Sequence, residues 1–126
     1  MSGRTVVWMD FRRDTGASPR DDIYGLNLDT HEELAIATDP LTFRPQVRIS
    51  CSRVVWEDWR TGLGSVFWSD LTTGVTVPLA GGFVDAGVPD IAGASVTYVE
   101  QRGDTASGDV YGVWVQTLNP YVQVVP

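Results

Sequence analysis

Three acidic residues, each followed two positions later by an arginine, are the most regular charged feature of the sequence. They are Asp10 with Arg12, Asp58 with Arg60, and Glu100 with Arg102. Residues two apart at the end of a strand point to the same side, so each carboxylate can pair with its guanidinium. Such pairs could recognise a ligand or could fasten a turn. We expect the structural role, because an element that recurs along a chain is more useful for building it.

Residues able to catalyse a reaction are scarce. The single histidine, His31, follows a turn-forming Asp-Thr pair and is expected at the surface. No nucleophile elbow, zinc-binding helix motif or phosphate-binding loop is present. Cys51 is the only cysteine, and we expect it to be a small buried substitute for a turn glycine. The sequence therefore predicts no enzyme activity, no metal site and no cofactor.

Length and charge limit the partners. The 126 residues allow one domain, predicted over 1–126, and 16 acidic against nine basic residues give a net charge of −7. That charge repels nucleic acid and anionic membranes. No apolar run approaches the roughly 20 residues needed to cross a bilayer. The polar run 13–22 lacks the alternating oxygen ligands of a calcium loop and is predicted to be solvated.

Two short blocks recur three times along the chain. In the first block, two β-branched residues precede an aromatic residue, which is Trp8, Trp56 or Tyr98. The second block is centred on Tyr24, Phe67 or Tyr111. Successive copies lie about 42 to 48 residues apart. We place the repeats at approximately 1–44, 45–87 and 88–126.

Each repeat is expected to form antiparallel strands, because β-branched and aromatic residues dominate its runs and Gly, Asp, Asn and Thr separate them. Beside the two blocks, inner strands are predicted at 47–50 and 90–92, and outer strands at 34–36, 75–77 and 122–124. Pro78 fits an outer, edge strand. The first repeat begins without an inner strand. A four-stranded unit of this period is typical of a β-propeller blade.

The aromatic residues divide into two groups. We expect Trp8, Trp56 and Tyr98 to fill the core between neighbouring blades. The positions of Phe11, Trp59, Trp68 and Trp114 are less determined. Trp59 follows a strand and could be exposed, where it would offer a surface for stacking a sugar or a peptide.

The blocks 54–60 (VVWEDWR) and 22–28 (DIYGLNL), with their copies, resemble the TolB-like (WD40-like) β-propeller repeats. The resemblance covers essentially the whole chain, with departures at Tyr98, Glu100 and Cys51. It implies an all-β propeller segment of three blades. It also implies a protein-binding module of the cell envelope or a non-catalytic propeller attached to a serine peptidase. The implied location is extracytoplasmic, although the chain starts without a signal peptide.

We therefore predict a non-catalytic binding or scaffold module for a protein or peptide. Its tentative binding residues are Asp10, Arg12, Asp58, Arg60, Glu100, Arg102 and Trp59. The alternatives are a carbohydrate-binding propeller and an accessory propeller of a larger peptidase or envelope protein. Three blades cannot close a ring, so we expect a homodimer of six blades, with eight-bladed or domain-swapped arrangements as alternatives.

Overall fold

The computed structural model describes residues 4–14, 16, 20–39, 42–80 and 85–100, together with the backbone of 109–114. These residues contain strands and turns but no helix, and therefore no helix that could span a membrane. The strands are β1 (Thr5–Asp10), β2 (Asp22–Asn27), β3 (Glu33–Ala37), β4 (Arg48–Ser50), β5 (Arg53–Asp58), β6 (Ser65–Asp70), β7 (Val75–Ala80), β8 (Ala86–Ala92), β9 (Ser95–Glu100) and β10 (Asp109–Trp114).

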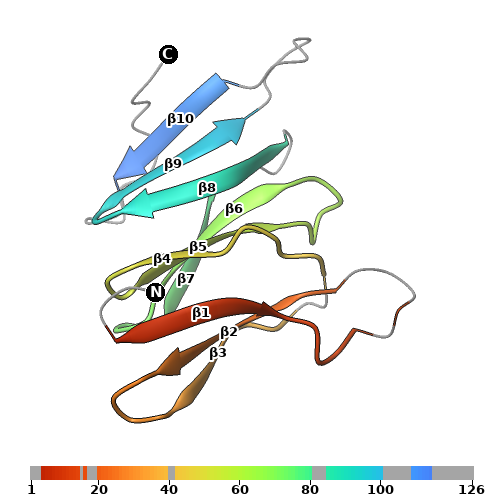
Figure 1. Cartoon of the computed structure of the whole chain (residues 1–126). Helices are drawn as coiled ribbons and strands as arrows, with labels where there is room; N and C mark the ends of the chain where they lie inside the picture. The colour runs from red at the N-terminus through yellow and green to blue at the C-terminus, as the bar shows by residue number, and fades with distance from the viewer. Residues whose placement is uncertain are drawn as a thin grey trace.

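The strands form three antiparallel sheets that stack face to face (Figure 1). Sheet 1 has the order β1-β2-β3, sheet 2 the order β4-β5-β6-β7, and sheet 3 the order β8-β9-β10. Among the described residues, sheet 1 has three strands, without the inner one, and sheet 2 has all four. The outer strand predicted at 122–124 lies outside the described residues, so sheet 3 is seen with three strands.

Most strand positions agree with the sequence prediction, and the largest difference lies in β8. This strand begins at Ala86 rather than at residue 90, because a bulge interrupts it: its register with β9 shifts between Gly87 and Asp90, and Val88 has a φ of 49°. Pro78 lies in β7 at the edge of sheet 2, where a missing N–H disrupts no inner ladder.

Two apolar clusters hold the stack together, one at each junction between sheets. At the first junction, Ile23 and Ala37 of sheet 1 pack against Val54 and Trp56 of sheet 2. At the second junction the buried residues are Val55, Val66, Trp68 and Leu79 of sheet 2 and Ala86, Ile91, Val96 and Tyr98 of sheet 3. Sheet 2 is therefore apolar on both faces, as a strand layer covered on both sides must be.

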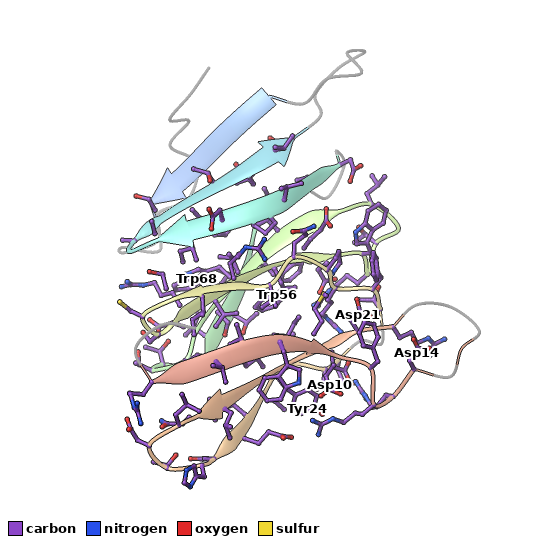
Figure 2. The ribbon with its side chains drawn as sticks, viewed as in Figure 1. Asp10, Asp14, Asp21, Tyr24, Trp56 and Trp68 are labelled. Atoms are coloured by element: carbon purple, nitrogen blue, oxygen red, sulfur yellow. The ribbon has the colours of Figure 1, made fainter. Side chains whose placement is uncertain are left out.

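The aromatic residues are buried according to what covers their sheet. Trp56 is fully buried and Tyr98 and Trp68 nearly so, which confirms the core positions expected for Trp56 and Tyr98 (Figure 2). Within the single chain, Trp8 lies half-buried on the face of sheet 1 that points away from sheet 2, so it fills no junction between the described sheets. Phe11 is 56% exposed. The side chain of Trp114 lies outside the described residues.

Cys51 occupies the turn of the hairpin between β4 and β5. Its φ of 53° is nearly that of Gly93, 59°, in the equivalent hairpin of sheet 3. The residue thus stands where a left-handed backbone favours glycine. It is exposed rather than buried, because the tight turn directs the side chain away from the sheet. The prediction of a buried cysteine is therefore corrected.

Candidate functional site

Two of the predicted acid–arginine pairs form closed clusters at the ends of β1 and β5, which we call the clamps. In sheet 1, Asp10 Oδ1 accepts hydrogen bonds from the backbone N of Arg12 at 2.9 Å and from its Nε at 2.8 Å. In sheet 2, Asp58 Oδ1 accepts the same two bonds from Arg60 at 3.0 and 2.8 Å. Each carboxylate fastens the turn that follows its strand, as the structural interpretation expects.

Aromatic residues complete both clamps, a feature that the sequence interpretation missed. The indole Nε1 of Trp8 donates to Asp10 Oδ2 at 2.9 Å, and that of Trp56 donates to Asp58 Oδ2 at 3.2 Å. The Arg12 guanidinium lies 3.8 Å above the Tyr24 ring, and Arg60 lies 4.2 Å above Phe67. The regular spacing of the aromatic residue two positions before each acid was the signal that could have revealed these bonds.

The clamps keep their carboxylates ionised. Hydrogen bonds from Arg12, aided by that of the Trp8 indole, hold the pKa of Asp10 well below its usual range. Burial alone would raise the pKa of Asp58, but hydrogen bonds from Arg60 and the charge of Arg44 hold it below its usual value. An ionised, fully bonded carboxylate is suited to fixing geometry rather than to transferring protons.

The third predicted pair is described only in part. Glu100 is 5% exposed at the end of β9, paired with Asp109 of β10 and Ala86 of β8. Arg102 lies outside the described residues. The pair therefore cannot be compared with the clamps of sheets 1 and 2.

Arg44 is the main residue of this region that the sequence interpretation missed. It is fully buried at the first junction, where Nε donates to Asp58 Oδ2 at 2.9 Å and Nη1 donates to the backbone O of Asp21 at 3.2 Å. The same Nη1 lies 3.6 Å from Asp22 Oδ1. One guanidinium thus joins sheet 1 to sheet 2. Its position in a connecting segment gave no periodic signal.

The second junction contains a carboxylate where the first contains this guanidinium. Glu57 lies against two glycines, Gly87 of sheet 3 and Gly64 in the loop between β5 and β6 of its own sheet. A methyl group at Gly87 would collide with its Oε1, and a Cβ at Gly64 would lie 3.1 Å from it. Asp85 is its charged neighbour and accepts a hydrogen bond from the Gly64 amide at 2.8 Å. Burial, with the charge of Asp85, raises the pKa of Glu57 and outweighs the opposing effect of the Trp59 side chain.

Of the other predicted site residues, Trp59 neighbours Glu57, whereas His31 lies apart from these clusters. Trp59 is half-buried and its ring packs against Phe43, with centroids 6.4 Å apart. His31 is exposed in the turn between β2 and β3. Among the described residues, no three His, Cys, Asp or Glu side chains come together as a metal site would require. The described geometry is that of braced turns and packed junctions.

Comparisons with known proteins give a fold but no sequence relative. No family model matches the chain, and no curated protein matches it. Among solved structures, the chain is similar to one named "putative TolB from Agrobacterium tumefaciens", with a TM-score of 0.65 and 14% identity. The match covers 89% of this chain and 42% of that one, so the chain spans less than half the length of that protein. The stacked sheets and their junctions thus have the fold of a TolB-like β-propeller.

Proposed function

We propose that the chain is a non-catalytic propeller module that binds a protein or peptide and completes its ring by association with a second copy. The TolB-like fold supports the binding role, and by the same likeness we place the protein outside the cytoplasm. The second copy would bind to the outer face of sheet 1, the face that points away from sheet 2. The main support for this association is the difference in burial between Trp56 and Trp8.

Trp56 and Trp8 have the same surroundings within their own sheets. Each indole bonds to its clamp carboxylate, and each ring stacks on the aromatic residue of the next strand, with centroids 6.0 Å apart for Trp56 and Phe67 and 6.5 Å for Trp8 and Tyr24. Trp56 is fully buried under sheet 1, whereas Trp8 is half-buried. The outer face of sheet 1 thus has the same aromatic arrangement as the face of sheet 2 that sheet 1 covers. A further sheet could pack on it in the same way.

Sheet 3 offers an outer face suited to this role. Thr97 and Val99 point away from sheet 2, at positions equivalent to Val7 and Met9 on the face of sheet 1 that covers Trp56. Gly112 in β10 likewise corresponds to Gly25 in β2. Sheet 3 of one copy could therefore cover Trp8 of the other. Two such contacts would close a ring of six sheets, within the range of about four to eight blades of natural propellers.

The surface offered to a protein or peptide partner would lie at the clamp end of the stack. Exposed apolar side chains gather on its loops, where Phe11 is 56%, Phe43 38% and Leu63 39% exposed. Apolar residues surrounded by polar groups are typical of a protein contact surface. No contact of Trp59 favours the carbohydrate-binding alternative over this one.

Light scattering on the purified chain tests the association. We expect a mass twice the 13.8 kDa of the chain at micromolar concentration. Thr97→Arg on sheet 3 and Trp8→Arg on sheet 1 should each give a monomer with unchanged circular dichroism. Thr30→Arg, in an exposed turn of sheet 1, is the matched control and should remain dimeric.

Mixing the two monomeric variants distinguishes a head-to-tail ring from a symmetric contact. A pair of one Trp8→Arg and one Thr97→Arg chain has one undamaged junction, so we expect partial recovery of the dimer. A wild-type chain that stays monomeric would contradict the association and leave the binding role of the fold untouched. A mixture that stays monomeric while the wild type dimerises would contradict the head-to-tail arrangement.

A further inference from the structure

Asp21, directly before β2, is a buried acid with no hydrogen bond to its carboxylate. The residue is 1% exposed, and neither Oδ1 nor Oδ2 has a hydrogen-bond partner. Only its backbone is fastened, by a bond from its N to Thr42 O at 3.1 Å and one from Arg44 Nη1 to its O at 3.2 Å. An ionised carboxylate in such a place loses its hydration and gains little in return, so burial favours its neutral form.

The charged groups around Asp21 come from three segments. Arg44, from the segment between β3 and β4, opposes the effect of burial, but its guanidinium bonds Asp58 and lies 3.6 Å from Asp22. Asp14, from the loop after β1, and Asp22, in β2, both add to it. Burial and these two acids raise the pKa of Asp21 above its usual value.

Glu57 gives the second junction a similar group. Its Oε1 packs against Gly87 and Gly64, and Asp85, at the start of sheet 3, is the charged residue that faces it. An uncharged carboxyl fits this contact better, because it lowers the repulsion from Asp85 and the cost of lost hydration. Each junction therefore holds a partly or fully buried acid that burial drives toward its neutral form, and both acids lie at the same end of the stack.

We propose that both junctions are proton-linked, so that protonation of Asp21 and Glu57 tightens the packing of sheet 1 and sheet 3 on sheet 2. This inference depends on burial and contacts within one chain and is independent of the proposed association. An acid that is more easily protonated in the folded state adds stability below its unfolded pKa and loses that contribution as the pH rises through its folded pKa. The stack should thus be firmest in mildly acid solution.

Asp10, Asp58 and Asp70, at the ends of β1, β5 and β6, set the opposite limit. The pKa values of Asp10, Asp58 and Asp70 are lowered in the folded protein, mainly through hydrogen bonds from Arg12, Arg60 and Thr72 that outweigh burial. Their stabilising contribution is present above the usual carboxyl range and is lost as the pH falls through their folded values. The two effects together predict a stability maximum near about pH 4 to 5.

Urea unfolding of the full chain at about pH 4.5 and about pH 7.5 tests the proposal, at one protein concentration because association would add its own stability. We expect the folding equilibrium constant of the wild type to fall about tenfold between these conditions. Asp21→Asn and Glu57→Gln should each remove part of this fall, and the double variant most of it. Asp39→Asn, with a side chain 90% exposed, is the control and should behave as the wild type.

Carbon-13 NMR of the carboxyl groups gives a second readout that needs no substitution. Asp21 and Glu57 should titrate above the usual pH range of Asp and Glu side chains. A double variant with the full wild-type pH dependence would overturn the proposal. So would carboxyl signals of Asp21 and Glu57 that titrate within the usual range of these side chains.

Discussion

The two junctions of the stack bury similar apolar clusters but differ at the rim, where polar groups meet. Backbone pairing sets the equivalence: Pro45 O accepts a bond from Glu57 N in sheet 2, and Gly87 pairs with Val99 in sheet 3. Met9, Asp21, Phe43 and Arg44 at the first junction correspond, in that order, to Glu57, Gly64, Asp85 and Ala86 at the second. The first junction is joined by a buried guanidinium, and the second by a carboxylate packed on glycine.

This difference shows how one backbone arrangement accepts two solutions. A long side chain from the connecting segment, Arg44, crosses the first junction and finds acids on both sheets. At the second junction the connecting segment is small, with Ala86 and Gly87, and Glu57 of the neighbouring sheet fills the space. The group that fills the rim is a cation at the first junction and an acid at the second. We therefore expect the two junctions to respond differently to substitution.

The largest effect should come from Trp56, the largest fully buried side chain of the first junction. Trp56→Ala should lower the free energy of unfolding by about 3–5 kcal/mol, because it leaves a cavity between sheets 1 and 2 and removes a bond to Asp58. Urea midpoints measure this loss. Trp8→Ala, compared with its parent in the monomeric Thr97→Arg background so that association does not contribute, is the control and should cost clearly less. Equal losses would mean that the covered and uncovered faces do not differ.

Arg44→Met should cost about 3 kcal/mol, because it keeps the apolar stem of the side chain but leaves buried carboxylates without their shared cation. The matched control is Arg48→Met, whose exposed guanidinium donates a hydrogen bond to the backbone O of Val47. Thermal or urea unfolding of both variants compares them. Similar stabilities would show that charge does not hold the first junction.

Gly87→Ala should destabilise the second junction by about 1–2 kcal/mol, because the added methyl forces Glu57 out of its place. The cost should largely disappear in the Glu57→Ala background, where the space is free. A double-mutant cycle of unfolding free energies isolates this coupling. Additive losses would contradict the contact between the carboxylate and the glycine.

The smallest effect concerns the hairpin turns at the opposite end of sheets 2 and 3. Cys51→Gly should stabilise the chain by about 0.5 kcal/mol, because glycine adopts the positive φ of this turn without steric cost. Gly93→Ala should destabilise it by about 1 kcal/mol for the converse reason. Differential scanning calorimetry resolves the two changes; shifts of the opposite sign would refute the equivalence of the two turns.

The strands were predictable because they depend on local patterns. The first aromatic block forms β1, β5 and β9, and the second forms β2, β6 and β10. Pro78 lies in an edge strand, as expected. What could not be predicted depends on contacts between distant segments. The burial of Trp8 depends on what covers sheet 1, and the extension of β8 depends on a bulge at Val88.

The sequence identified the acid–arginine pairs of the clamps but not the contacts that link them to other segments. The spacing of Asp10 with Arg12 and of Asp58 with Arg60 announced the clamps, and the structure gives them the expected turn contacts. Arg44 was missed because only the stacking of two sheets brings a connecting segment 14 residues away to Asp58. Asp21 was assigned to a solvated loop, whereas the packing of sheet 1 on sheet 2 buries it.

The most direct test of the account is a crystal structure of the purified chain in its associated form. We predict six sheets around one axis, with Trp8 of each copy buried beneath Thr97 and Val99 of the other as Trp56 is buried beneath sheet 1. A solvent-exposed Trp8, or one packed against Trp8 of a second copy, would contradict the account.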